Sequence, residues 1–118
     1  MLWSDIIDIS WSDHKLQKTC ASDKAGQRKW GADHWKLLQR RLASLLAAPT
    51  LKDMDGVPGR CHPLGADRHG QFAVALWGAY RLVFAPNHDP LPVLADGGLD
   101  VTLVTRIVIE EVVDYHGD

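Results

Sequence analysis

The hydrophobic periodicity of the chain changes at Pro49, and this change restricts the fold to one that combines helices with strands. Before Pro49, the apolar residues of ADHWKLLQRRLASLLAA recur at spacings of three and four, which predicts an amphipathic helix over residues 32–48. After residue 50, segments such as QFAVALW alternate apolar and polar positions, as strands do. The sequence therefore predicts an α+β domain, with helices on one face of a twisted, mainly antiparallel sheet.

The apolar stripe of the 32–48 helix is expected to lie in the core, and Asp33 is expected to cap its start. Before this helix, DIIDISW (residues 5–11) predicts a first strand, and a short helix follows it with Ser12 or Asp13 as the N-cap. The stretch between Gly26 and Gly31 fits either a turn or a continuation of the helix. The stripe consists of Trp35, Leu38, Leu42, Leu45 and Leu46.

The second half of the chain predicts a hairpin, a long loop and a final strand. QFAVALW and AYRLVFAP are joined through Gly78, which indicates two antiparallel strands with a tight connection. NHDPLPVLADGGLD predicts a loop of about 15 residues, a length that is usually functional or flexible. The β-branched run VTLVTRIVIEEVVDY, residues 101–115, predicts a central strand.

Length and composition favour one soluble domain spanning residues 1–118. Hydrophobic residues make up 46% of the chain and charged residues 24%, which are average values for globular proteins. No apolar run is long enough to cross a membrane, and MLWSDIIDIS does not have the basic start of a secretory signal. With only Cys20 and Cys61, the chain offers no disulfide framework, so we expect reduced thiols and a cytoplasmic location.

Charge is distributed unevenly along the chain. Residues 14–41 hold eight Lys and Arg against two Asp, a balance of +6, whereas residues 86–118 hold one Arg against seven acids, a balance of −6. Such asymmetry favours a polyanionic or a charged protein partner. Ordinary solvated helix faces explain the positive segment equally well.

Ionisable residues concentrate in CHPLGADRHG, which contains His62 and Arg68, and in the DYH of residues 114–116. Arg81 lies between these two motifs, within the apolar strand YRLVF. In a regular strand Asp114 and His116 project to one face and Tyr115 to the other, whereas a bulge would bring all three together. The simpler interpretation makes Tyr115 a core residue and its neighbours solubilising residues at a strand end.

Three chemistries fit these residue types to different degrees. The histidines lack the ligand spacing of a zinc site, and no motif marks a Ser or Cys nucleophile. Metal-free cleavage of RNA needs a base, an acid and cations around the phosphate, and it needs no cofactor. His62 and His116 suit the first two tasks, and Arg68 and Arg81 suit the third.

The segment HPLGADRHGQFAVALWGAYRLVF (residues 62–84), together with DYH, resembles the HigB-type toxins of the RelE/ParE superfamily. LQRRLASLLAAPTLKDM resembles the helical part of the longer members, so the resemblance covers nearly the whole chain. It implies two N-terminal helices packed on a twisted antiparallel sheet. It also implies an endoribonuclease that cuts messenger RNA, typically on the ribosome, and that a HigA-type helix-turn-helix antitoxin neutralises. Operator DNA would be bound only through that antitoxin.

Carried over by motif, the resemblance implies a catalytic group and a set of phosphate-binding residues. Two departures from the family pattern affect it: Gly65 stands where a Lys is common, and Gln71 and Phe72 replace two large aromatics. The alternatives are a ParE-like inhibitor of DNA gyrase and an inactive binding module on the same fold. The implied catalytic residues are His62, Asp114, Tyr115 and His116. Arg68 and Arg81 match Arg positions of the family's motif strings, and the predicted RNA-binding residues are these two together with Arg40 and Arg41 of the basic helix.

Overall fold

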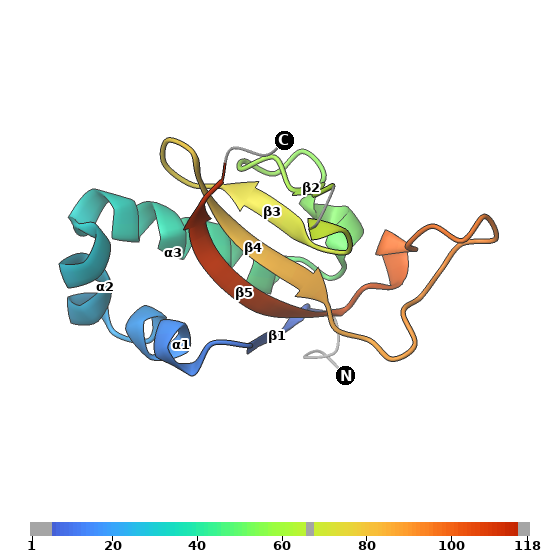
Figure 1. Cartoon of the computed structure of the whole chain (residues 1–118), viewed down its shortest axis with the longest axis horizontal. Coiled ribbons are helices and arrows are strands. Elements are labelled where there is room, and N and C mark those ends of the chain that lie inside the picture. Colours follow the sequence, from blue (N-terminus) through green and yellow to red (C-terminus); the bar gives the residue numbers. More distant parts are fainter. Residues whose placement is uncertain (1–5, 66–67, 116–118) are drawn as a thin grey trace.

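Figure 1 shows helices in the first half of the chain and a curved sheet built mainly from the second half. This computed structural model describes residues 6–65 and 68–115. The order of elements is β1 (Asp8–Trp11), α1 (His14–Cys20), α2 (Asp23–Trp30), α3 (Ala32–Ala47), the 3-10 helix η2 (Leu51–Met54), β2 (His62–Pro63), β3 (Phe72–Ala75), β4 (Tyr80–Pro86), the 3-10 helix η4 (Val101–Leu103) and β5 (Arg106–Asp114).

The five strands form one mixed sheet in the order β1-β5-β4-β3-β2. Only β1 and β5 run parallel, and the other neighbours are antiparallel, which confirms the expected α+β class and the mainly antiparallel sheet. The hairpin between β3 and β4 is also confirmed. The last strand starts later than the sequence indicates, because Val101–Leu103 forms a 3-10 turn and β5 begins at Arg106.

Three α-helices precede β2 where the resemblance implies two. The stretch around Gly26 is a helix of its own, α2, because the Ser22 side chain accepts a hydrogen bond from the Ala25 N–H at 3.2 Å and starts a new helix. The lack of a side chain at Gly26 lets α2 approach α3 closely, with the indole of Trp35 against its backbone. The predicted N-cap of α1 is confirmed as Asp13.

The long helix α3 (Ala32–Ala47) closely matches its predicted range. Its N-cap and one residue of its apolar stripe differ from the prediction. Its N-cap is Gly31, with φ 89° and no capping side chain, so the prediction that Asp33 caps the helix is wrong. Asp33 lies instead in the first turn, where a carboxylate interacts favourably with the helix dipole. The prediction that Leu46 is a core residue is also wrong, because its side chain is 51% exposed. Trp35, Leu38 and Leu45 are buried as expected, and Leu42 is partly buried.

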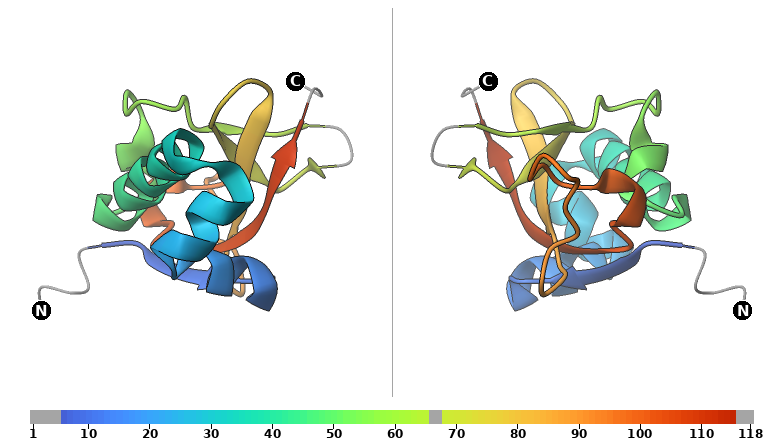
Figure 2. Two further views of the ribbon diagram at one scale, coloured as in Figure 1. Left: turned by 90° about the vertical axis from the view of Figure 1, so that its left-hand side faces the viewer. Right: turned by 90° about the vertical axis from the view of Figure 1, so that its right-hand side faces the viewer.

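The main core lies between the helices and one face of the sheet. Side chains of α3 pack there against Val74, Leu82, Phe84 and Ile109 of the strands. We call this face the helical face, and the opposite one the outer face. Figure 2 shows the helices gathered on the helical face.

The segment between β4 and β5 projects from the body of the domain (Figure 1). It is held at its base because the His88 ring nitrogen Nε2 accepts hydrogen bonds from the backbone N–H groups of Thr105 and Arg106. Towards its tip, Val93 and Leu99 form an isolated antiparallel bridge. The predicted long loop is therefore present. In the described part of the chain, no helix is both long and apolar enough to cross a membrane.

Candidate functional site on the outer face of the sheet

A β-bulge in β5 decides which residues reach the outer face. Val83 pairs with Glu111 and Phe84 pairs with Ile109, so Glu110 is an extra residue without a cross-strand partner. Before the bulge, the odd-numbered Ile109 packs into the core on the helical face. After it, the odd-numbered Val113 and Tyr115 pack on the opposite side, in a small apolar cluster with Leu64, Ala73 and Val83.

Arg68 contacts three other residues of this outer face. Its Nη1 donates to the carboxylate Oε2 of Glu111 at 2.6 Å and to the amide Oε1 of Gln71 at 3.2 Å. The guanidinium carbon also lies 5.2 Å from the ring centroid of Tyr115, close enough for a cation–π contact. The Arg68 side chain is 24% exposed. Its guanidinium group is thus held over the apolar outer-face cluster while still in contact with solvent.

Glu111 and Gln71 are site residues that inspection of the sequence missed. A sequence signal for Glu111 was present, because the acidic pair at residues 110 and 111 interrupts the β-branched run of the last strand. Such a pair indicates either a bulge or a specific contact, and here it accompanies both. Gln71 carries no comparable signal, because a Gln before a strand is common on protein surfaces.

Tyr115 and Asp114 point to opposite sides of the sheet. Tyr115 joins the outer-face cluster, and its backbone N–H donates to the Ala79 carbonyl at 3.0 Å, which continues the strand past Asp114. Asp114 pairs in register with Tyr80 and is exposed. By strand alternation its side chain belongs to the helical side. His116, the predicted partner of Asp114, lies outside the described residues.

His62 lies on the same outer face as Arg68, in the short strand β2. It pairs with Ala73, which in turn is opposite Val83, and Val83 is opposite Glu111. The Cα of His62 is thus three strand spacings, about 14 Å, from that of Glu111. Its Nδ1 is 2.8 Å from the Arg60 carbonyl, and because a carbonyl only accepts, Nδ1 carries the hydrogen and a neutral ring has its lone pair on Nε2.

The backbone that presents His62 is strained. Arg60 has φ 49°, in the left-handed region that residues other than glycine seldom occupy, and its neighbour Gly59 has φ 111°. A left-handed conformation at a residue other than Gly costs about 1–3 kcal/mol and is found preferentially at functional sites. The strain at Arg60 turns its carbonyl towards the imidazole of His62.

Arg81 also faces the outer side, between Ala75 and Val113 in the register of the sheet. Its Nη1 donates to the carbonyls of Gly78 and Tyr80, at 3.2 and 2.9 Å. Its Nε is buried and has no hydrogen-bond partner among the described residues. A buried donor without an acceptor is costly, so Arg81 is held in its place at an energetic penalty.

Arg40 and Arg41 are not brought together with Arg68. Both belong to α3, which covers the helical face of the sheet. Arg41 has a structural contact, because its Nε donates to the Ala75 carbonyl at 2.9 Å and its side chain packs against Gly59. Arg40 is exposed on the helix surface.

The two cysteines are poor nucleophiles in this environment. Burial raises the pKa of the Cys20 thiol to about 11, and burial together with the charge of Asp55 raises the pKa of Cys61 to about 12. At neutral pH both thiols are protonated, and the thiolate is the reactive form. Within the described ranges, no three His, Cys, Asp or Glu residues are grouped so that they would hold a metal ion.

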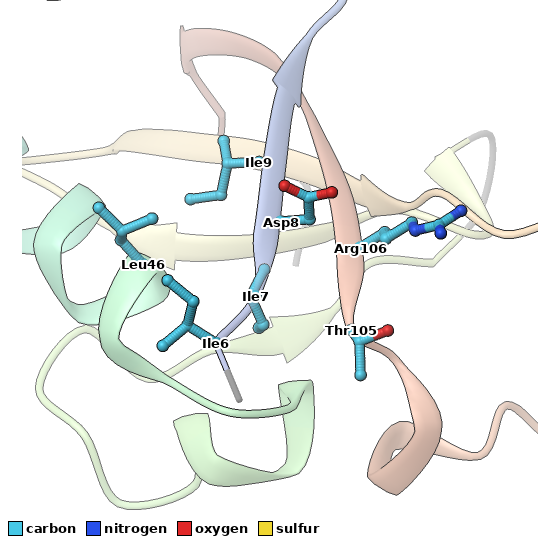
Figure 3. A pocket seen from close by; sticks show the side chains of 7 residues that line it. All are labelled: Ile6, Ile7, Asp8, Ile9, Leu46, Thr105 and Arg106. Carbon is cyan, nitrogen blue, oxygen red and sulfur yellow. The ribbon is translucent and has the colours of Figure 1, made fainter. Parts of the chain in front are cut away.

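A separate cavity of about 480 Å³ lies beside β1 and the start of β5 (Figure 3). Ile6, Ile9 and Leu46 form its apolar side, and Asp8 and Arg106 lie on the other side of the strand. None of the residues implied to be catalytic lines this cavity.

Comparisons of the chain with models of protein families, with curated proteins and with solved structures give no match. The described residues form an α+β domain of three α-helices and a five-stranded sheet, with a cluster of Arg, Glu, Gln and Tyr on the sheet face opposite the helices.

Proposed function

We propose that this chain is a toxin of a type II toxin–antitoxin system, a RelE/ParE-like, HigB-type endoribonuclease that cleaves messenger RNA without a metal ion. The observation that carries the proposal is the placement of Arg68 on the Tyr115 ring, on the same sheet face as His62. These are residues that the family resemblance implies for RNA cleavage, and they come from three separate parts of the chain.

The proposed reaction is attack of a 2′-hydroxyl on the adjacent phosphate. The O2′–P bond forms while the P–O5′ bond breaks, which yields a 2′,3′-cyclic phosphate and a free 5′-hydroxyl. His62 is the proposed general base that takes the proton from the 2′-hydroxyl, with its Nδ1 held at the Arg60 carbonyl. His116 is then the proposed acid that protonates the leaving O5′.

The cations and hydrogen-bond donors of the outer face are proposed to stabilise the charge on the phosphorane. Arg68 presents a guanidinium fork, and Arg81 lies on the same face of the sheet. The Tyr115 ring supports the Arg68 guanidinium from below. Asp114 is assigned to orienting the imidazole of His116, which follows it by two residues. Because the side chain of Asp114 belongs to the helical side, this proposed pair acts from the end of β5 and not from the outer face itself.

The proposed partners are a HigA-type antitoxin that also binds operator DNA, and messenger RNA on the ribosome, in a bacterial cytoplasm. The positive segment of residues 14–41 supports a nucleic-acid partner despite the net charge of −2. Arg40 and Arg41 lie away from the outer face, so any RNA they bind would be outside the cleavage site.

Expression in a bacterium tests the proposal. The wild-type chain is expected to arrest growth, and His62→Ala or His116→Ala is expected to relieve the arrest, whereas the control His14→Ala, an exposed residue of α1, is not. A cell-free translation reaction should then show messenger cut at defined positions. Normal growth with abundant soluble protein would rule out a toxin, and a DNA-damage response without cut messenger would indicate a gyrase inhibitor.

A further inference from the structure

A groove with a volume of about 420 Å³ lies between the first two helices and β5. Lys15 and Leu16 of α1 and Lys29 and Trp30 of α2 form one wall, and Glu111 and Val112 of β5 form the other. Glu111 is the residue that the groove shares with the outer-face site, where its carboxylate pairs with Arg68 at 2.6 Å. The groove therefore borders the outer-face site at Glu111.

The groove exists because β1 is shorter than β5. β1 ends at Trp11, which pairs with Ile109, so beyond that point the side of β5 that faces away from β4 has no strand partner in the described part. The bulge at Glu110 lies at this boundary and turns Glu111 outwards. The first two helices then flank an open strand edge instead of a completed sheet.

The charges of the groove favour an anion. Its two carboxylates are already engaged: Asp13 caps α1 through the backbone N–H groups of Lys15 and Leu16, and Glu111 pairs with Arg68. The ammonium groups of Lys15 and Lys29 have no carboxylate within 4.0 Å among the described residues. The groove thus presents two uncommitted positive charges, on the segment of the chain that carries the +6 balance.

The floor of the groove is apolar and rigid. Leu16 is buried, and the Trp30 indole stacks on Trp35 with ring centroids 6.1 Å apart and planes 16° from parallel. Lys29 lies 5.8 Å from the Trp30 ring centroid. Cationic side chains beside a fixed aromatic ring are the combination with which proteins bind single-stranded nucleic acid, through phosphate contacts and base or sugar packing.

We infer that this groove binds a nucleotide of single-stranded RNA next to the scissile phosphate. Lys15 and Lys29 contact its backbone phosphates, and Trp30 with Leu16 packs against its sugar or base. The inference rests on the proposed function, because it extends the RNA from the Arg68 site past Glu111 into the groove. The strand thereby crosses β5 at the bulge.

The test uses the full chain and a fluorescent 2′-O-methyl octauridylate, which cannot be cleaved because its attacking hydroxyl is blocked. Binding is measured by anisotropy over a range of salt concentrations. Lys15→Glu with Lys29→Glu is expected to weaken binding at least tenfold and to reduce the slope of log affinity against log salt by about 1.4, at roughly 0.7 for each lost phosphate contact. Circular dichroism checks that each variant remains folded.

Lys18→Glu with Lys24→Glu is the matched control, because it makes the same charge change on the same two helices outside the groove. A control that loses as much affinity as the groove variant would overturn the inference, since the loss would then reflect net charge alone. An abasic octamer is expected to bind several-fold more weakly. Equal binding of the abasic strand, with equal competition by a polyglutamate decamer, would overturn it in favour of an acidic peptide.

The outcomes also separate this inference from the proposed function. If the wild type cleaves messenger RNA and the groove variant binds the octamer as the wild type does, the groove inference fails and the nuclease stands. If the wild type binds the octamer through the groove but never cleaves RNA, the nuclease proposal fails and the RNA-binding groove stands.

Discussion

The guanidinium of Arg68 and the carboxylate of Glu111 meet at 2.6 Å although the two residues are 43 positions apart in the sequence. The contact joins the connection after β2 to the bulged strand β5, over the apolar cluster of the outer face. It also places an acid on Arg68, which contacts the Tyr115 ring. A phosphate that binds Arg68 must compete with this carboxylate.

Glu111→Gln is therefore expected to tighten RNA binding. The glutamine can still accept a hydrogen bond from Arg68, but it removes a negative charge beside the incoming phosphate. An exposed ion pair contributes roughly 0.2–1 kcal/mol, so we expect up to about a fivefold gain in affinity for the 2′-O-methyl octauridylate and little change in thermal stability. Glu110→Gln, next to it on the strand, is the control. Weaker binding by Glu111→Gln would show that the carboxylate itself supports the site.

Tyr115→Phe separates the two roles of the tyrosine. The phenyl ring keeps the packing under Arg68 and the apolar cluster, so the free energy of unfolding should be almost unchanged. The hydroxyl has no hydrogen-bond partner among the described residues, and is thus available to donate to the phosphorane. Loss of such a donor is expected to lower the rate of RNA cleavage by about 10²-fold. Unchanged cleavage by Tyr115→Phe would restrict Tyr115 to a packing role. Tyr80→Phe, which removes a tyrosine hydroxyl elsewhere in the sheet, is the control.

Gly65→Lys is expected to strengthen RNA binding. A Cβ at this glycine would meet no atom within 4 Å, and its φ is not in the left-handed region, so the substitution should fold normally. The added ammonium would follow His-Pro-Leu beside the outer face. We expect the salt slope of RNA binding to grow by about 0.7, the increment for one phosphate contact with a single strand. Ala95→Lys adds the same charge in the projecting loop, and an equal effect there would contradict a local contact.

Gly26→Ala should destabilise the protein, although alanine is favoured over glycine in a helix by about 1 kcal/mol. A Cβ at this position would lie 2.4 Å from Cδ2 of Trp35. The indole cannot easily move, because its Nε1 donates to Asp23 at 2.9 Å and its ring stacks on Trp30. Overpacking costs about 1–3 kcal/mol, so a lower urea midpoint is expected. A higher midpoint would contradict the close approach of the two helices.

Alkaline pH is expected to weaken the fold through the buried thiols. An exposed cysteine ionises near 9.0, whereas burial raises the pKa of Cys20 to about 11 and that of Cys61 to about 12. Because the folded pKa values are raised, the folded state retains these protons. The contribution of the thiols to the free energy of unfolding is therefore fully present below pH 9, and it is lost as pH rises through the folded pKa values. Urea unfolding at pH 8 and pH 10 should show a smaller pH effect in Cys20→Ala with Cys61→Ala. Parallel pH profiles for the two proteins would show that the thiols do not contribute.

Local features of this chain were predictable from the sequence because their causes lie within a few residues. The Asp13 cap needs only the backbone N–H groups of the next turn, and the stripe of α3 needs only its 3.6-residue period. The β3–β4 hairpin needs alternation and a tight turn at Gly78. The α+β class then follows from the order of these elements.

Other features depended on contacts between distant segments. The additional helix α2 packs on Trp35 of α3 through Gly26, a contact that no local pattern encodes. Arg41 looks like a surface cation in the sequence, but it donates to the Ala75 carbonyl on the third strand. Leu46 belongs to the apolar stripe, yet it lines an open cavity beside β1 and is exposed.

The placement of Tyr115 shows most clearly what the sequence alone does not predict. The sequence by itself determined that Asp114 and Tyr115 face opposite sides, because side chains in a strand alternate. Only the tertiary structure decided which side each one takes, since one extra residue at Glu110 shifts the phase of β5 and turns Tyr115 from the core towards Arg68. The physical reason is that a bulge is set by pairing with the neighbouring strand, and the sequence of one strand does not specify its register with that neighbour.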